Sequence, residues 1–174
     1  MTFNMAEQWL VKRGVSLESI AEIVLHLQQP YNAALTLEDC LDSVRAVTRK
    51  REVQYTLITG IALDMLAEQK LLPEPLQAIM ETDESLYGVD ETLALGITSV
   101  YGMIGLTSFG YLDKAKLGII HHLNSDTTQI HVFLDDIVAG LAAAASARIA
   151  HHNKRAQQYG EGGACGSDDE NANS

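Results

Sequence analysis

Residues 130–143, IHVFLDDIVAGLAA, form an apolar run that carries two adjacent carboxylates, Asp135 and Asp136. The length of this run and its alanine-rich continuation predict a helix rather than a strand. Apolar residues occupy almost every side of it, and a helix of that kind is usually buried. We therefore predict an interior helix with two acids that need a cation, strong hydrogen-bond donors or a proton.

Helical patterns continue on the N-terminal side of this run. Residues 16–28 and 36–51 carry apolar stripes at helical spacing, and they begin at the N-cap candidates Ser16 and Thr36. The segment 53–70 is apolar on most sides, which predicts a central helix, and its Gly60 would let another helix approach closely.

The same signals predict three more helices in the second half of the chain. They cover a short segment at 75–81, residues 90–101, and a long helix that Asp126 or Thr127 caps and that runs to about 155. Four glycines make 102–125 the least regular segment of the predicted core.

Length and composition indicate one helical domain. The chain has 174 residues, of which 47% are hydrophobic and only three are proline, so it can bury a substantial core. We predict an all-α, single-domain bundle of about six helices around a central helix, formed by residues 1–155. The glycine-rich, acidic remainder, 156–174, is predicted to be a disordered tail.

Charge and targeting signals exclude several classes of protein. The formal net charge is −11, which argues against nucleic acid as a partner and disfavours electrostatic docking on an anionic membrane. No signal peptide is recognisable, and the longest candidate span, 137–147, is too short to cross a bilayer. The chain has only two cysteines, which favours a reducing compartment. Together these signals lead us to expect a cytoplasmic protein without a transmembrane segment.

Acidic residues are concentrated in the most apolar part of the chain. Between positions 71 and 147 the sequence holds ten acids but only two bases, Lys114 and Lys116. Protein cations alone are too few to neutralise these carboxylates. A hard divalent metal such as Mg²⁺, bound by carboxylates, water and a substrate phosphate, would do so.

Each acid also has a purely structural interpretation. Asp90 alone is more simply explained as an N-cap, with Glu91 favourable near the helix N-terminus, and Asp113 alone as a turn residue. The pair Asp135–Asp136 is different, because successive helical residues point roughly 100° apart. At least one of the two must face apolar surroundings, which favours a functional site.

Three segments together resemble the phosphatidylglycerophosphatase A family. They are VDETLALG at 89–96, YLDKAKL at 111–117 and LDDIVAG at 134–140, within a resemblance that covers roughly 60–150. Asp90, Glu91 and Gly96 correspond to the family's Asp-Glu pair and glycine. Asp113 and Lys116 correspond to its Asp-x-x-Lys-Pro element, although Leu117 replaces the proline. Asp135, Asp136, Ala139 and Gly140 match its Asp-Asp-x-x-Ala-Gly helix in full.

The resemblance implies Mg²⁺-dependent hydrolysis of a phosphate monoester, with phosphatidylglycerophosphate as the family's substrate. Five residues would bind one or two metal ions, namely Asp90, Glu91, Asp113, Asp135 and Asp136. The metal would offset the repulsion between acids and phosphate and help to generate a hydroxide nucleophile. Lys116, with or without Lys114, would contact a phosphate oxygen, and one carboxylate would act as general base.

The membrane spans of the better-known family members are missing here, which leaves alternatives open. One is a phosphatase of a soluble phosphate ester. Another is a non-enzymatic helical oligomer or binding module with a structural cation site. The apolar stripes of 16–28 and 36–51 favour a homo-oligomer, and peripheral contact with a membrane through an apolar patch stays compatible with the sequence.

Overall fold

The computed structural model describes the backbone of residues 5–160 and the side chains of residues 5–152. Its elements are α1 (Met5–Lys12), α2 (Leu17–Gln28), α3 (Leu37–Thr48), α4 (Arg51–Glu68), α5 (Leu76–Thr82), α6 (Val89–Thr98), the 3₁₀ turn η1 (Ser99–Tyr101), α7 (Gly102–Ala115), α8 (Ile119–Ser125) and α9 (Leu134–Gly160). These described residues contain no strand, so the predicted all-α class is confirmed.

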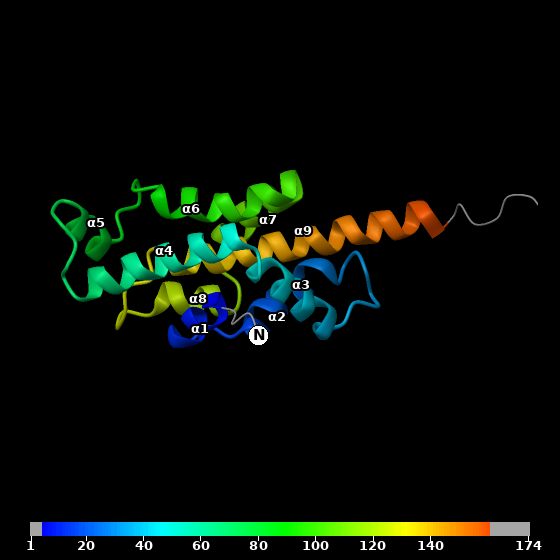
Figure 1. Ribbon diagram of the computed structural model, residues 1–174, viewed down its shortest axis with the longest axis horizontal. Helices are drawn as coiled ribbons and strands as arrows, with labels where there is room; N and C mark the ends of the chain where they lie inside the picture. The colour runs from blue at the N-terminus through cyan, green and yellow to red at the C-terminus, as the bar shows by residue number, and fades with distance from the viewer. Residues whose placement is uncertain (1–4, 161–174) are drawn as a thin grey trace, which may run out of the picture.

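Helix α9 is the centre of the bundle. It packs against α2, α3, α4, α6, α7 and α8, and it runs through the long axis of the molecule in Figure 1. Ile137 and Leu141 have no exposed surface, as their apolar surroundings in the sequence predict. The prediction that 53–70 is the central helix was wrong, because α4 buries one face and leaves Tyr55 61% exposed.

Local capping signals were predicted correctly for two helices. The Ser16 hydroxyl accepts the backbone N–H of Ser19 at 3.1 Å and so caps α2. Thr36 caps α3 and forms a reciprocal capping box with Asp39.

Two glycines allow helices to approach α9 closely. A Cβ at Gly60 of α4 would collide with the side chain of Ile137, and one at Gly140 of α9 would lie 3.1 Å from the carbonyl oxygen of Ala94. Both residues thus leave room for a neighbouring helix to pack closely against α9, which for Gly60 confirms the sequence prediction.

The segment 102–125 differs from its prediction, because it is largely helical. It forms α7 and α8, so the bundle has more helices than the six expected. The long helix also begins later than predicted. Asp126 and Thr127 lie in the loop after α8, and α9 starts at Leu134.

Helices α6 and α7 form a hairpin along α9. The hairpin starts and ends near Asp136, while the carbonyl oxygen of Tyr101 at its turn lies 3.2 Å from Nε2 of His151, about four turns further along α9. By length and composition this stretch, 89–115, would suffice to cross a membrane, so the prediction that 137–147 is the longest candidate span was wrong. In the structure it is bent at Gly102, whose φ of 70° marks the start of α7.

The structure corrects the predictions made for the two ends of the domain, namely the exposed stripes near the N-terminus and the end of the last helix. The apolar stripes of α2 and α3, which were expected to favour an oligomer, are buried within the bundle against each other and α9. Helix α9 continues to Gly160 rather than ending near 155, and its C-terminal part projects beyond the other helices in Figure 1. Residues 161–174 of the predicted tail lie outside the described residues.

Candidate metal centre

Three helix ends bring the predicted site residues together. Asp90 and Glu91 lie in the first turn of α6, and the last turn of α7 carries Asp113, with Lys116 directly after it. Asp135 and Asp136 lie in the first turn of α9. Asp90 is not the N-cap of α6, because Gly88 takes that position, and Asp113 lies within a helix rather than in a turn.

Asp90, Glu91 and Asp136 form the part of the cluster that can hold a cation. One carboxylate oxygen from each of the three lies within 4.8 Å of the others. Asp136 is only 3% exposed and Asp90 9%. Oδ1 of Asp90 and Oε2 of Glu91 are buried without a hydrogen-bond partner among the described residues. Because unpaired buried carboxylate oxygens are unfavourable, this all-oxygen donor set fits a hard divalent cation.

The electrostatics of these carboxylates show that positive charge is scarce around them. Burial, together with the neighbouring charge of Asp135, raises the pKa of Asp136 to about 8. Burial and the adjacent Glu91 raise the pKa of Asp90 to about 7. Near neutral pH these groups therefore either share protons or bind a cation.

Lys116 forms the other half of the cluster. Its Nζ lies 3.1 Å from Oδ1 of Asp113, 3.0 Å from Oδ2 of Asp135 and 3.7 Å from Oδ1 of Asp136. Burial alone would lower the pKa of this lysine, but the surrounding carboxylates, Asp135 first, outweigh burial and raise it. Lys116 is thus charged, and Asp136 belongs to both halves.

The predicted ligands are therefore divided between two partners. Asp113 and Asp135 face Lys116 rather than the oxygens of Asp90, Glu91 and Asp136, and burial still raises the pKa of Asp135 despite the lysine. Lys114, by contrast, is exposed on α7.

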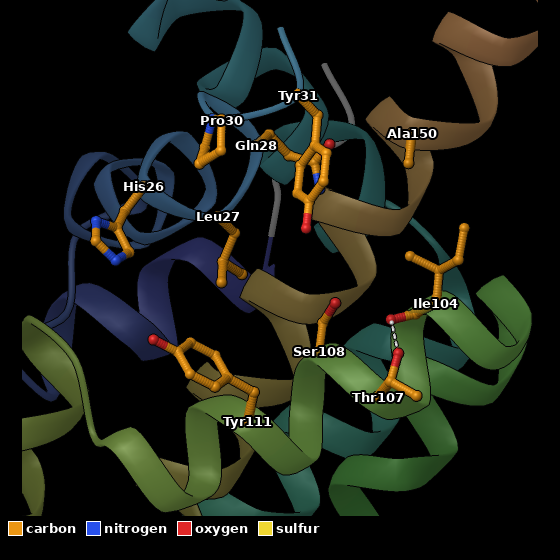
Figure 2. Close-up of a pocket in the computed structure, with 10 residues that line it drawn as sticks. All are labelled: His26, Leu27, Gln28, Pro30, Tyr31, Ile104, Thr107, Ser108, Tyr111 and Ala150. Carbon is orange, nitrogen blue, oxygen red and sulfur yellow. Dashed lines mark hydrogen bonds between the residues drawn. The ribbon is translucent and has the colours of Figure 1, made fainter.

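A pocket of about 350 Å³ adjoins Asp135 and is lined by acidic and polar side chains, among them Asp83, Asp126 and His131. A larger pocket of about 680 Å³ lies between α2, α7 and α9 and contains none of the predicted site residues. Figure 2 shows Tyr31 and Tyr111 at this second pocket, with the hydroxyl of Thr107 bonded to the carbonyl of Ile104 at 3.2 Å. The acidic cluster and the large pocket are thus separate features.

One buried acid near the cluster was missed in the sequence. Asp64 of α4 is fully buried and contacts the start of α9. Asp64 interrupts the largely apolar run 57–67, which is the same kind of signal that identified Asp135 and Asp136, so the sequence could have revealed it.

Comparison with known proteins assigns the chain to a family. Residues 8–151 match the sequence profile described as Phosphatidylglycerophosphatase A. The chain belongs to the phosphatidylglycerophosphatase A family. This membership suggests a phosphatase-like role and agrees with the resemblance found in the three acidic segments.

Relatives in this family are similar over most of their length. The uncharacterized protein YpjQ of Bacillus subtilis (strain 168) is 56% identical over 154 residues, which are 88% of this chain and 87% of YpjQ. The crystal structure of ypjQ from Bacillus subtilis superposes with a TM-score of 0.83 at 57% identity and covers 86% of this chain and 93% of that one. The low temperature requirement C protein from Listeria monocytogenes has a TM-score of 0.83 at 53% identity, covering 86% of this chain and 94% of that one.

Proposed function

We propose that this protein is a Mg²⁺-dependent hydrolase of phosphate monoesters and that its substrate is phosphatidylglycerophosphate. The observation that carries the proposal is the pair of buried carboxylate oxygens, on Asp90 and Glu91, that have no partner among the described residues and lie beside Asp136. Family membership supports both the reaction and the lipid substrate.

Asp90, Glu91 and Asp136 would hold the cation in this proposal. When bound there, Mg²⁺ would supply positive charge that screens the substrate phosphate from the acids and polarises its oxygens. One carboxylate of the cluster would accept a proton from the attacking water as general base.

Lys116 would bind the phosphate directly. Its Nζ is already beside Asp136, so a phosphate oxygen placed between the two halves of the cluster would meet an ammonium group. Asp113 and Asp135, at 3.1 and 3.0 Å, would hold the lysine in that place. A lysine acts here as a point charge rather than as a planar fork.

Contact with a lipid surface is supported by apolar side chains close to the acids. Leu86 is 90% exposed and Val89 48%; Val89 directly precedes Asp90 in the chain, and Leu86 lies four residues before it. The following 21 residues, 92–112, contain no charged side chain. We propose that Leu86, Val89 and the uncharged segment 92–112 contact acyl chains while the acids reach the headgroup phosphate.

The test is phosphate release from phosphatidylglycerophosphate in detergent and from soluble phosphate esters, with Mg²⁺ and then with chelator. We expect lipid turnover that chelator removes and that Asp136→Asn lowers by about 100-fold or more. Asp42→Asn, which changes an exposed acid on α3, should leave turnover unchanged. Recovery of the protein with sedimented vesicles is the second readout, and it tests the proposed contact with a lipid surface.

Other outcomes would change the proposal in defined ways. Turnover of soluble esters alone would keep the hydrolase and discard the lipid. The absence of any turnover in a folded protein would favour a structural cation site, as in a non-enzymatic binding module. A result independent of chelator would overturn the metal dependence.

A further inference from the structure

The N-terminus of α9 is capped by a residue from another helix. Oδ1 of Asp64 accepts the backbone N–H of Phe133, and Oδ2 accepts that of Leu134, both at 3.0 Å. The first N–H groups of a helix have no acceptor within it, so a cap must come from elsewhere. Asp64 is fully buried in α4, some 70 residues earlier in the chain.

A second acid of α4 holds the chain just before this cap. Glu68, one turn after Asp64, accepts the backbone N–H of Ile130 at 2.9 Å. Its two oxygens also bind Arg13, at 2.7 and 3.1 Å, and Arg13 donates to the carbonyl of Ile130 at 2.8 Å. Both backbone polar groups of Ile130 are thus held.

His131 adds two further contacts to this segment and also lines the pocket beside Asp135. Its Nδ1 lies 3.3 Å from an Arg13 nitrogen and its Nε2 lies 3.3 Å from Oδ2 of Asp126. Because a guanidinium only donates, Nδ1 accepts from Arg13 and the Nε2–H group donates to Asp126. The backbone of 130–134 is therefore fixed from α4, from Arg13 and from the loop after α8.

We propose that Asp64 and Glu68 are positioning residues for the cation site, which set the orientation of Asp135 and Asp136. This inference rests on the proposed function, because it assumes that the trio of acids binds a cation. Successive residues on a helix point roughly 100° apart, so one orientation of the first turn of α9 directs Asp136 at Asp90 and Glu91 and Asp135 at Lys116. A rotation or shift of that turn would displace both carboxylates together.

Asp64→Asn tests the inference with little change of volume. Both oxygens of Asp64 are used as acceptors, whereas an amide offers one acceptor and places its NH₂ against the second backbone N–H. We expect the variant to fold and to bind Mn²⁺, the probe cation, about 10-fold or more weakly than the wild type in calorimetric titrations.

Ser43→Ala is the matched control. Ser43 is also fully buried and donates to the carbonyl of Ala145 on α9 at 2.9 Å, nine residues beyond Asp136. We expect this variant to lower the melting temperature without a change in Mn²⁺ affinity. If Asp64→Asn behaves in the same way, Asp64 only stabilises the fold and the inference is overturned.

Glu68→Gln keeps the inference testable if Asp64→Asn fails to fold. Glu68 is partly exposed and its replacement leaves the cap itself intact, so we expect a folded protein with Mn²⁺ binding weakened several-fold. Unchanged affinity would overturn the inference while leaving the proposed function in place. A wild-type protein that binds no Mn²⁺ would instead overturn the cation site, and both proposals with it.

Discussion

Lys116 has a backbone conformation that is uncommon for its residue type. With a φ of 46° it lies in the left-handed region directly after α7, where glycine or asparagine is usual. This conformation ends the helix and places the side chain among three carboxylates. The lysine therefore acts as the counter-ion of the cluster as well as the end of a helix.

Removing this counter-ion should destabilise the metal-free protein. We expect Lys116→Met to lower the free energy of unfolding by about 1–3 kcal/mol, because buried Asp135 and Asp136 would lose their ammonium partner. Urea unfolding in the presence of chelator measures the change. Lys114→Met, an exposed change two residues away, should stay within about 0.5 kcal/mol of the wild type. Equal effects of the two variants would contradict the role given to Lys116.

At this scale the sequence revealed which residues meet but not how they pair. Adjacent acids within an apolar run identified Asp135 and Asp136, and the resemblance to the family's Asp-x-x-Lys-Pro element identified Asp113 and Lys116. Their division between a lysine and a cation-binding trio depends on where three helix ends meet. No local pattern specifies that arrangement.

Among the glycines in the described part of the chain, Gly60 at the contact of α4 with α9 leaves the least space for a Cβ. We expect Gly60→Ala to lower the free energy of unfolding by about 1–3 kcal/mol, because its Cβ would collide with Ile137 in a close-packed core. Thermal or urea unfolding checks this value. Gly96→Ala is the matched control inside α6. Its Cβ would meet nothing within 4 Å, so it should stabilise by up to about 1 kcal/mol. Stabilisation by both changes would refute the close contact.

Most helices were predictable because their signals are local. Ser16 and Thr36 cap α2 and α3 as the sequence indicates. The helices in segment 102–125 were not predicted, because the glycines there were interpreted as helix breakers. Gly105 instead serves a tertiary contact, since a Cβ would lie 2.7 Å from the carbonyl oxygen of Thr98. The start of α9 was missed for a similar reason, because its cap comes from Asp64 on another helix.

For the whole molecule, stability should depend on pH in a direction set by its buried acids. Burial raises the pKa of Asp64 and of Asp136 to about 8, and that of Asp90 to about 7. A carboxyl whose pKa is raised by folding stabilises the protein while both states hold its proton. That stabilisation is lost as pH rises from about 4 to about 8.

Melting temperatures measured from pH 5 to pH 9 would check this dependence. With chelator present, we expect the melting temperature to fall across that range. With Mg²⁺ present we expect a smaller fall, because the deprotonated ligands bind the cation and binding stabilises the folded state. Asp136→Asn should flatten the profile in chelator. A melting temperature that rises with pH in chelator would contradict the raised pKa values.

The central position of α9 also has a consequence for the order of events during synthesis. The ribosome makes α1 to α8 before α9, yet α9 is the main packing partner of α6 and α7 and also covers part of the apolar faces of α2 and α3. A nascent chain that ends before residue 134 has no axis on which to assemble and lacks Asp135 and Asp136. The earlier helices therefore keep apolar surface exposed until α9 has been made. Binding of the proposed cation would require that α9 has packed onto them, because Asp136 is part of the site.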